Sequence, residues 1–229
     1  MYHRTLITFT CLTFLIHFFM INILIGMKRW GTMVRTREFN TEKALDAAMQ
    51  VFWEKGYEAT SLTDLTQAMG IQRPSLYAAF GDKKGLFEAT LRRYTAQHAA
   101  QIRTWLQQES TVKAAFRGLF ERIGSVNETL ASCQRGCFCI NTMVELAPHD
   151  PRFAILTREH QLYLAAIFKE VIERGQQSKE LSNSLDAGAL AQSLVITMIG
   201  LTVLTKSGPD PVFIKHSIET TLTLLEEER

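Results

Sequence analysis

The 229-residue chain is poor in the residue types that mark several non-globular classes of protein. It has only 5 prolines and 13 glycines, which excludes a collagen-like or low-complexity chain. Four cysteines do not make a disulfide scaffold, and a reducing compartment, the cytoplasm, is the expected location. Charge of neither sign dominates, because 25 basic and 23 acidic side chains give a net charge of +2. With 46% hydrophobic residues, the chain is expected to be globular rather than disordered.

The motifs that carry common enzyme chemistry are missing as well. The sequence contains no Walker phosphate-binding loop, no G-x-G-x-x-G, no H-E-x-x-H and no G-x-S-x-G. A small helical enzyme is therefore disfavoured, and we predict no catalytic residue and no cofactor.

One long hydrophobic run is present near the N-terminus. Residues 6–25 carry no formal charge, and twenty residues of helix can cross the roughly 30 Å hydrocarbon core of a bilayer. Basic residues flank the run, so a membrane anchor here would leave the rest of the chain in the cytoplasm. The alternative, which we favour, is that translation starts at Met33. Residues 1–32 are therefore set apart as a hydrophobic extension, and a membrane is an expected partner only if residues 6–25 are translated.

The sequence after this extension is typical of successive helices. Thr41 is predicted to cap a first helix with paired apolar residues every four positions, and Gly56 is predicted to end it. Ser61 is predicted to cap a second, short helix. Pro74 falls in the first turn of a third helix, where the missing N–H of proline has no consequence. An amphipathic fourth helix is predicted over residues 83–108.

Two short helices that follow a longer packing helix form a helix-turn-helix pattern. The second short helix has to bury an apolar face and present a polar face to the major groove of DNA. Leu76 and Phe80 lie four residues apart and are predicted to face inward. The polar side chains free to reach DNA are then Gln72, Arg73, Ser75 and Tyr77.

Residues 44–62 and 69–87 resemble the TetR/AcrR family of bacterial transcriptional repressors, and the likeness is specific from about Thr41 to Tyr94. It implies an all-α fold: a three-helix helix-turn-helix DNA-binding domain at 33–94 and a helical ligand-binding and dimerisation domain at 95–229. It further implies a homodimer on an inverted-repeat operator in double-stranded DNA, released by an unidentified small-molecule effector. Activation instead of repression remains open. The diagnostic residues are Gly56, Tyr57, Thr60, Gly70, Leu76, Tyr77, Phe80 and the stretch Lys83–Phe87.

The resemblance assigns DNA contacts to particular positions. Arg73 is the best candidate for a bidentate contact to guanine, worth roughly 1–3 kcal/mol of discrimination. Ser75 and Tyr77 would position the helix through phosphates, and Thr63 lies on the same approach. Lys84, with Lys83 as a neighbouring possibility, would neutralise a phosphate. The candidate flexible arm ahead of the first helix carries Arg35 and Arg37.

Plainer interpretations stay open for some of these residues. Tyr77 could be a core aromatic side chain with one exposed edge, and Lys83 and Lys84 could be a solvated helix start. Cations are disfavoured at that end of a helix, which mildly supports the phosphate role. Residues 33–94 hold nine basic and eight acidic side chains, so we expect modest non-specific DNA affinity.

The C-terminal half is predicted to form four or five further helices. The last two are apolar and suggest a partner surface, which the resemblance identifies as the dimer interface. The predicted ranges are 111–130, 136–146, 150–175, 186–208 and 213–226.

The resemblance also implies an internal ligand cavity between the DNA-binding helices and the dimer interface. At each candidate position an ordinary core role is the alternative, because aromatic residues and methionines at helical spacing are commonly core. The candidate lining residues are Phe116, Phe120, Cys137, Phe138, Met143, Phe168 and Met198.

Three cysteines, Cys133, Cys137 and Cys139, depart from the pattern of a generic helical domain. They could react with oxidants or electrophiles beside Arg135, or bind a soft metal such as Cu(I). Their C-x3-C-x-C spacing is not a recognised zinc pattern, and buried cysteine is commonly an inert small hydrophobe. We favour the structural role and predict no metal site. Further soft or nitrogen ligands nearby would be Met143, His149 and His160.

Overall fold

The structure is a computed structural model that describes residues 40–124 and 135–225, and every regular element in these two ranges is an α-helix. The predicted all-α fold class is therefore confirmed. The helices are α2 (Thr41–Lys55), α3 (Leu62–Met69), α4 (Arg73–Phe80), α5 (Lys83–Gln107), α6 (Val112–Gly124), α8 (Phe138–Glu145), α9 (Pro151–Gln177), α10 (Ala187–Thr205) and α11 (Pro211–Leu222).

Polar caps set where the helices begin. Ser61 and Asp64 form a reciprocal capping box at α3: the Asp64 N–H donates to Ser61 Oγ at 3.0 Å, and the Ser61 N–H donates to Asp64 Oδ2 at 2.9 Å. The predicted cap of α2 is wrong by one residue. Asn40 holds the extended backbone, and its side-chain oxygen accepts the Lys43 N–H at 3.0 Å, which leaves Thr41 as the first helical residue.

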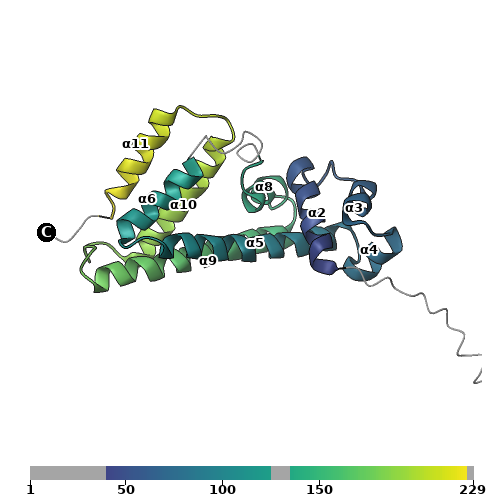
Figure 1. The fold of residues 1–229 in the computed structure, drawn as a ribbon, viewed down its shortest axis with the longest axis horizontal. Coiled ribbons are helices and arrows are strands. Elements are labelled where there is room, and N and C mark those ends of the chain that lie inside the picture. The colour runs from purple at the N-terminus through teal and green to yellow at the C-terminus, as the bar shows by residue number, and fades with distance from the viewer. Residues whose placement is uncertain (1–39, 125–134, 226–229) are drawn as a thin grey trace, which may run out of the picture. The chain divides into compact units, whose positions relative to one another are not determined.

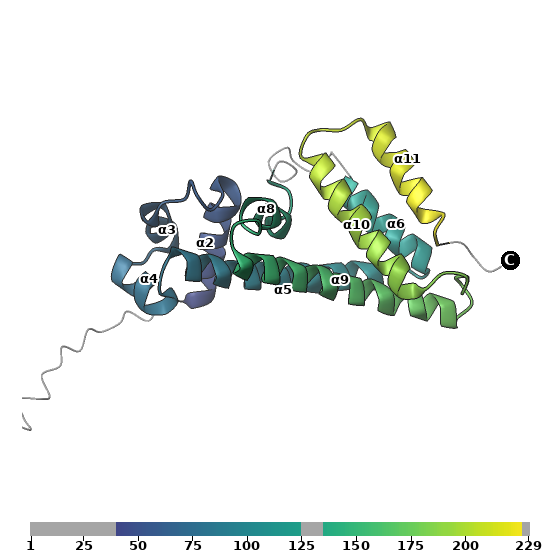
Figure 2. The same cartoon turned by 180° about the vertical axis from the view of Figure 1, so that it is seen from behind.

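Helices α5 and α9 are the two longest helices of the described part of the chain, and they run side by side (Figure 1). Helices α2, α3 and α4 pack around the first part of α5, and α8 packs against both α5 and α9. Helices α6, α10 and α11 gather around the other end of the α5–α9 pair, as the view from behind also shows (Figure 2).

Two hydrophobic cores lie along this arrangement, and α5 contributes to both. The boundary predicted at residues 94 and 95 falls inside α5: Tyr94 belongs to the first core and Ala99 to the second. Phe138 of α8 and Phe153 of α9 come from beyond that boundary but pack in the first core, against Phe87 of α5 at ring-centroid distances of 5.2 and 5.3 Å. The C-terminal helices therefore help to build the core of the DNA-binding region.

Helix α10 is unusually apolar on every side. Among the described residues it is the one helix that is long and apolar enough to cross a membrane, judged by length and composition alone. Leu190, Leu194 and Met198 are buried in the second core, whereas Ile196 is 70% exposed. We interpret α10 as a core helix with an apolar outer face. The hydrophobic run at residues 6–25 lies outside the described residues.

Candidate DNA-binding surface and internal cavity

Helices α3 and α4 are joined through a glycine turn. Leu65 of α3 and Leu76 of α4 are fully buried. Gly70 ends α3 with a left-handed backbone, φ 66°, which allows the Ile71 N–H to donate to the Thr66 carbonyl oxygen at 3.1 Å. This fixes the start of α4, with Gln72 preceding its first residue.

A second glycine sets the passage from α4 into α5. Asp82 caps α5 by accepting the Gly85 N–H at 2.6 Å. A Cβ atom at Gly85 would collide with the carbonyl oxygen of Phe80, so a larger residue there would shift the end of α4. The close approach of the Phe80 carbonyl oxygen thus explains why a glycine, Gly85, occupies this position in the stretch Lys83–Phe87.

The side chains predicted to reach DNA come from α3, from the residue before α4 and from the first two turns of α4. Gln72 and Arg73 are exposed, Ser75 is half-buried, and the Tyr77 side chain is 46% exposed, which excludes a core role for that ring. Arg73 Nη2 donates to Thr63 Oγ1 at 2.9 Å, so the two predicted residues touch. We call the face formed by Thr63, Gln72, Arg73, Ser75 and Tyr77 the α3–α4 surface.

The two lysines at the start of α5 have protein partners in this structure. Lys84 forms an ion pair with Asp150, the cap of α9, and this pair holds the pKa of Asp150 below its usual value. Lys83 Nζ lies 4.4 Å from the centre of the Tyr57 ring. Arg35 and Arg37 lie outside the described residues. A phosphate contact by Lys84 would therefore compete with Asp150.

A cavity of about 290 Å³, partly open to the surface, lies between the two cores. Of the predicted lining residues, Cys137, Met143 and Met198 line it. Phe138 instead lines a separate groove beside α2. Phe116, Phe120 and Phe168 are fully buried, with the rings of Phe116 and Phe168 5.0 Å apart, and none of the three lines the cavity. The lining residues that sequence reasoning did not place there include Trp53, Tyr94, His98, Trp105 and His160.

The cavity wall contains a pair of histidines from two different helices. His98 Nδ1 of α5 and His160 Nε2 of α9 lie 3.1 Å apart, within hydrogen-bond distance. The His98 ring stacks on Tyr94, with 5.5 Å between ring centres and 11° between planes. Burial lowers the pKa of both imidazoles to about 4, so both are neutral at pH 7. Sequence reasoning considered His160 only as a metal ligand.

The cysteines of the cavity wall are buried free thiols. The Tyr94 hydroxyl donates to Cys137 Sγ at 3.2 Å, and burial raises the pKa of both Cys137 and Cys139. A raised pKa keeps a thiol protonated and unreactive, which favours the structural role. The described residues contain no cluster of three His, Cys, Asp or Glu side chains arranged to hold a metal ion. Cys133 lies outside those residues.

The segment around α8 connects this cavity to α2. Trp53 lines the cavity and its Nε1 donates to the carbonyl oxygens of Arg135 and Gly136, at 3.2 and 3.1 Å. At the other end of α8, Glu145 Oε1 accepts the Tyr57 N–H at 2.9 Å, just beyond the end of α2. No sequence motif indicated either contact.

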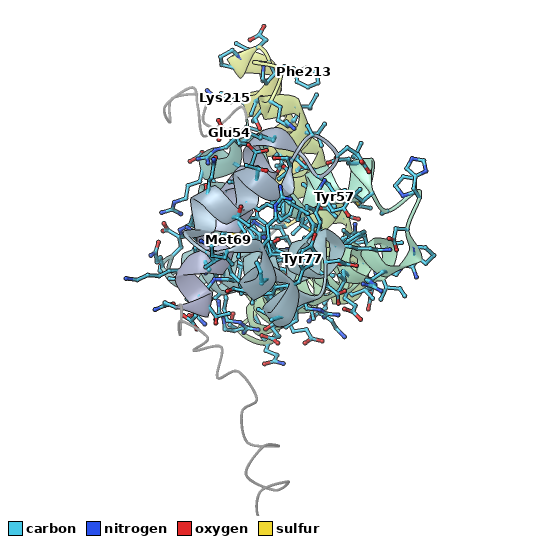
Figure 3. All side chains as sticks on the ribbon, turned by 90° about the vertical axis from the view of Figure 1, so that its right-hand side faces the viewer. Glu54, Tyr57, Met69, Tyr77, Phe213 and Lys215 are labelled. Atoms are coloured by element: carbon cyan, nitrogen blue, oxygen red, sulfur yellow. The ribbon has the colours of Figure 1, made fainter. Side chains whose placement is uncertain are left out.

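An apolar face remains uncovered on α10 and α11. Phe213 is 57% exposed, and Figure 3 shows its ring standing out from α11. Val212 on the same helix is exposed, as are Ile196, Val203 and Leu204 on α10. Several exposed apolar side chains on two neighbouring helices are typical of a protein–protein interface.

A helix-turn-helix surface joined to a helical region with a cavity defines a DNA-binding transcriptional regulator. Family models support this class over most of the chain. Residues 44–90 match the model described as "Bacterial regulatory proteins, tetR family", and residues 113–220 match "Tetracyclin repressor-like, C-terminal domain". The chain belongs to the TetR family, as predicted, and is a regulator rather than an enzyme.

Individual relatives agree with this assignment. The chain is 32% identical over 196 residues to the uncharacterized HTH-type transcriptional regulator YezE of Bacillus subtilis (strain 168), covering 85% of this chain and 100% of YezE. It is 32% identical over 197 residues to the HTH-type transcriptional repressor ComR of Escherichia coli (strain K12), covering 84% and 92%. A cysteine mutant of the regulator CifR, solved with 26-bp operator DNA, matches with a TM-score of 0.69 and 29% identity over 83% of this chain and 99% of that one.

Proposed function

We propose that this protein is a homodimeric repressor that binds an inverted-repeat operator through its α3–α4 surface and leaves it when a small-molecule effector occupies the cavity. The observation that carries the proposal is the exposed polar face of α4 next to Thr63, over a fully buried Leu76. Such a helix offers base-reading side chains while its other side is held by the core. Because the partner is DNA, we expect the protein in the cytoplasm.

Each residue of the surface has a proposed role. Arg73, at the start of α4, would exchange its bond to Thr63 for a bidentate contact with guanine O6 and N7. Gln72, Ser75 and Tyr77 would contact bases or phosphates beside it. Lys84 would bind a phosphate after leaving Asp150, and the arm with Arg35 and Arg37 would add backbone or minor-groove contacts.

The homodimer is proposed from the apolar face of α10 and α11. Two copies related by a twofold axis would bury Ile196 and Phe213, which are 70% and 57% exposed in the single chain. Two recognition helices one helical turn of DNA apart would then meet the two half-sites of an inverted repeat.

Effector release is proposed from the position of the cavity. Its wall includes Trp53 of α2 and Cys137 at the start of α8, so a ligand would bias the contact between the two helices. Release would then follow from the difference in effector affinity between the DNA-bound and free conformers.

The test is a titration of the full-length protein against DNA flanking its own gene, over a series of salt concentrations. We expect saturable binding to one inverted repeat that weakens steeply with salt. Arg73→Ala should lower the affinity about 5- to 150-fold and relax the preference at one base pair. The matched control is Arg92→Ala, which removes an exposed arginine paired with Glu88 on α5, away from the α3–α4 surface. Equal loss in both variants, or no DNA binding at low salt, would contradict the proposal.

A further inference from the structure

The polar side chains of the cavity wall differ in whether their hydrogen bonds are already made. The Tyr94 hydroxyl donates to Cys137 Sγ. Thr202 donates to the Met198 carbonyl oxygen at 2.8 Å, within its own helix. A group that already has a good partner gains little from a ligand. The Tyr94 and Thr202 hydroxyls therefore shape the cavity and are not expected to donate a hydrogen bond to a ligand.

The His98–His160 pair is different, because it keeps both an N–H donor and an acceptor unused, whereas the Tyr94 and Thr202 hydroxyls have used their only donor. Each neutral imidazole has one N–H donor and one lone-pair acceptor. The contact between His98 Nδ1 and His160 Nε2 uses one donor and one acceptor, so the two outer nitrogens are left as one donor and one acceptor in either tautomer. The two roles swap only if the shared proton moves to the other imidazole and the outer proton is exchanged through solvent.

Both histidines line the cavity. Neither outer nitrogen has a hydrogen-bond partner within the described ranges 40–124 and 135–225. No fully enclosed side-chain nitrogen or oxygen in those ranges lacks a partner. His160 lines both the cavity and a surface groove between α5 and α9. The pair is thus available to a molecule in the cavity.

Among the described lining residues of the cavity, the imidazoles and thiols around the pair are uncharged at neutral pH. Burial lowers the pKa of the two imidazoles and raises the pKa of the neighbouring Cys137 and Cys139 thiols, which keeps all four groups neutral. Arg122 is the charged side chain among the described lining residues; it is exposed and lies over the Trp105 ring at 5.6 Å. An ionised ligand group beside the histidines would lack a counter-charge, which is costly in a buried site.

Size and wall chemistry restrict the ligand further. A volume of about 290 Å³ lies at the lower end of the roughly 300–1,000 Å³ typical of small-molecule sites, which favours a small ligand. The rings of Trp53, Tyr94 and Trp105 are part of the wall, together with aliphatic side chains such as Leu164. Flat apolar molecules suit walls of this kind.

We propose that the effector is a small, uncharged, mainly aromatic molecule with one hydrogen-bonding group, a hydroxyl or a carbonyl, and that the outer nitrogens of the His98–His160 pair bind this group. The inference deepens the proposed function, since it names the class of ligand for the cavity through which release would act. The histidines determine specificity, and the aromatic wall supplies the apolar contact.

Calorimetric titration of the full-length protein at pH 7.5 with three matched probes tests this assignment. The probes are 4-ethylphenol, ethylbenzene, which lacks the hydroxyl, and 4-ethylbenzoate, which carries a charge. We expect 4-ethylphenol to bind about tenfold more tightly than ethylbenzene, as one net hydrogen bond allows, and 4-ethylbenzoate to bind more weakly than either. Equal affinity for the first two probes, tighter binding of the benzoate, or no binding by any probe would overturn the proposal.

Variants locate the effect on the histidines. In His160→Leu the advantage of 4-ethylphenol over ethylbenzene should vanish, while Thr202→Val, which removes a hydroxyl already bonded to its own helix, should keep it. If the wild-type advantage persists in a folded His160→Leu protein, the pair is not the anchor. Should His160→Leu fail to fold, nitrogen NMR of the wild-type imidazoles decides the matter: their signals must shift with 4-ethylphenol and not with ethylbenzene.

The outcome is separable from the DNA-binding proposal. Titration of probes does not require an operator, and operator binding does not require a probe. Loss of probe binding with intact operator binding would overturn only the ligand assignment. Intact probe binding without any operator binding would overturn only the repressor assignment.

Discussion

The polar side chains of the α3–α4 surface are mostly exposed to solvent, whereas the His98–His160 pair in the cavity wall is largely buried. On the surface, the exposed Arg73 donates to Thr63 Oγ1, and this is the bond that we propose it exchanges for a nucleic-acid partner. In the cavity, burial keeps both imidazoles neutral. The two proposed sites would therefore differ in kind: one would bind a polyanion in a salt-dependent way, and the other would recognise a molecule by shape and one hydrogen bond.

The largest effect of a single substitution should come from a buried core aromatic side chain, compared with an aromatic side chain on the surface. Phe168 is fully buried against Phe116, so Phe168→Ala should lower the free energy of unfolding by about 3–5 kcal/mol. Tyr77→Ala removes a ring of similar size that is 46% exposed and should cost about 1 kcal/mol or less. Urea denaturation at one fixed protein concentration measures both. Similar losses would mean that the two environments do not differ as described.

The buried histidines and the more exposed aspartates should lower the free energy of unfolding in different ranges of pH. As pH falls from 6.5 to about 4, the unfolded chain protonates His98 and His160 before the folded chain does. The free energy of unfolding should therefore drop across this window, by up to about 3 kcal/mol for each imidazole. Asp46 and Asp150 have lowered pKa values, so the stability they contribute is lost only as pH falls below about 3.8.

Denaturation curves at successive pH values measure this window. The double variant His98→Gln, His160→Gln should have a nearly flat profile between pH 6.5 and about 4.5. His149→Gln, at an exposed position, is the matched control and should keep the wild-type slope. A wild-type profile that is flat there would show that the pair does not resist protonation.

The smallest effect should come from the ion pair between Lys84 and Asp150. Asp150→Asn keeps the oxygen that caps α9 and removes the charge, so stability should change by less than about 1 kcal/mol for this partly exposed pair. The freed Lys84 should raise operator affinity a few-fold at low salt, and Lys84→Gln should lower it. Operator titration checks both directions, and unchanged affinity in both variants would remove Lys84 from the DNA contacts.

The helices and the α3–α4 surface could be predicted because their determinants are local. Ser61, Gly70 and Pro74 act within a few residues of their own positions, and the inward-facing Leu76 fixes which neighbours are exposed. Even the error at Thr41 is one residue, since Asn40 is an equally good cap by sequence.

The cavity could not be predicted in the same way, because it depends on how distant helices cross. Phe116, Phe120 and Phe168 have the helical spacing of a lining but pack on one another. His98 and His160 are 62 residues apart, and no local pattern predicts that they meet. Cys137, Met143 and Met198 do line the cavity, but apolar type alone does not distinguish such positions from ordinary core.

Helix α5 joins the two hydrophobic cores, and its length and stiffness determine how movement at one core reaches the other. It is 25 residues long and has no glycine or proline after Gly85, so nothing in its sequence favours a hinge. At 1.5 Å per residue it is about 37 Å long, and a tilt of about 5° around one end moves the other by about 3 Å. Since Leu86 and Leu91 sit in the first core and Ile102 and Leu106 in the second, α5 acts as a stiff lever that converts small changes in packing at one end into displacement at the other.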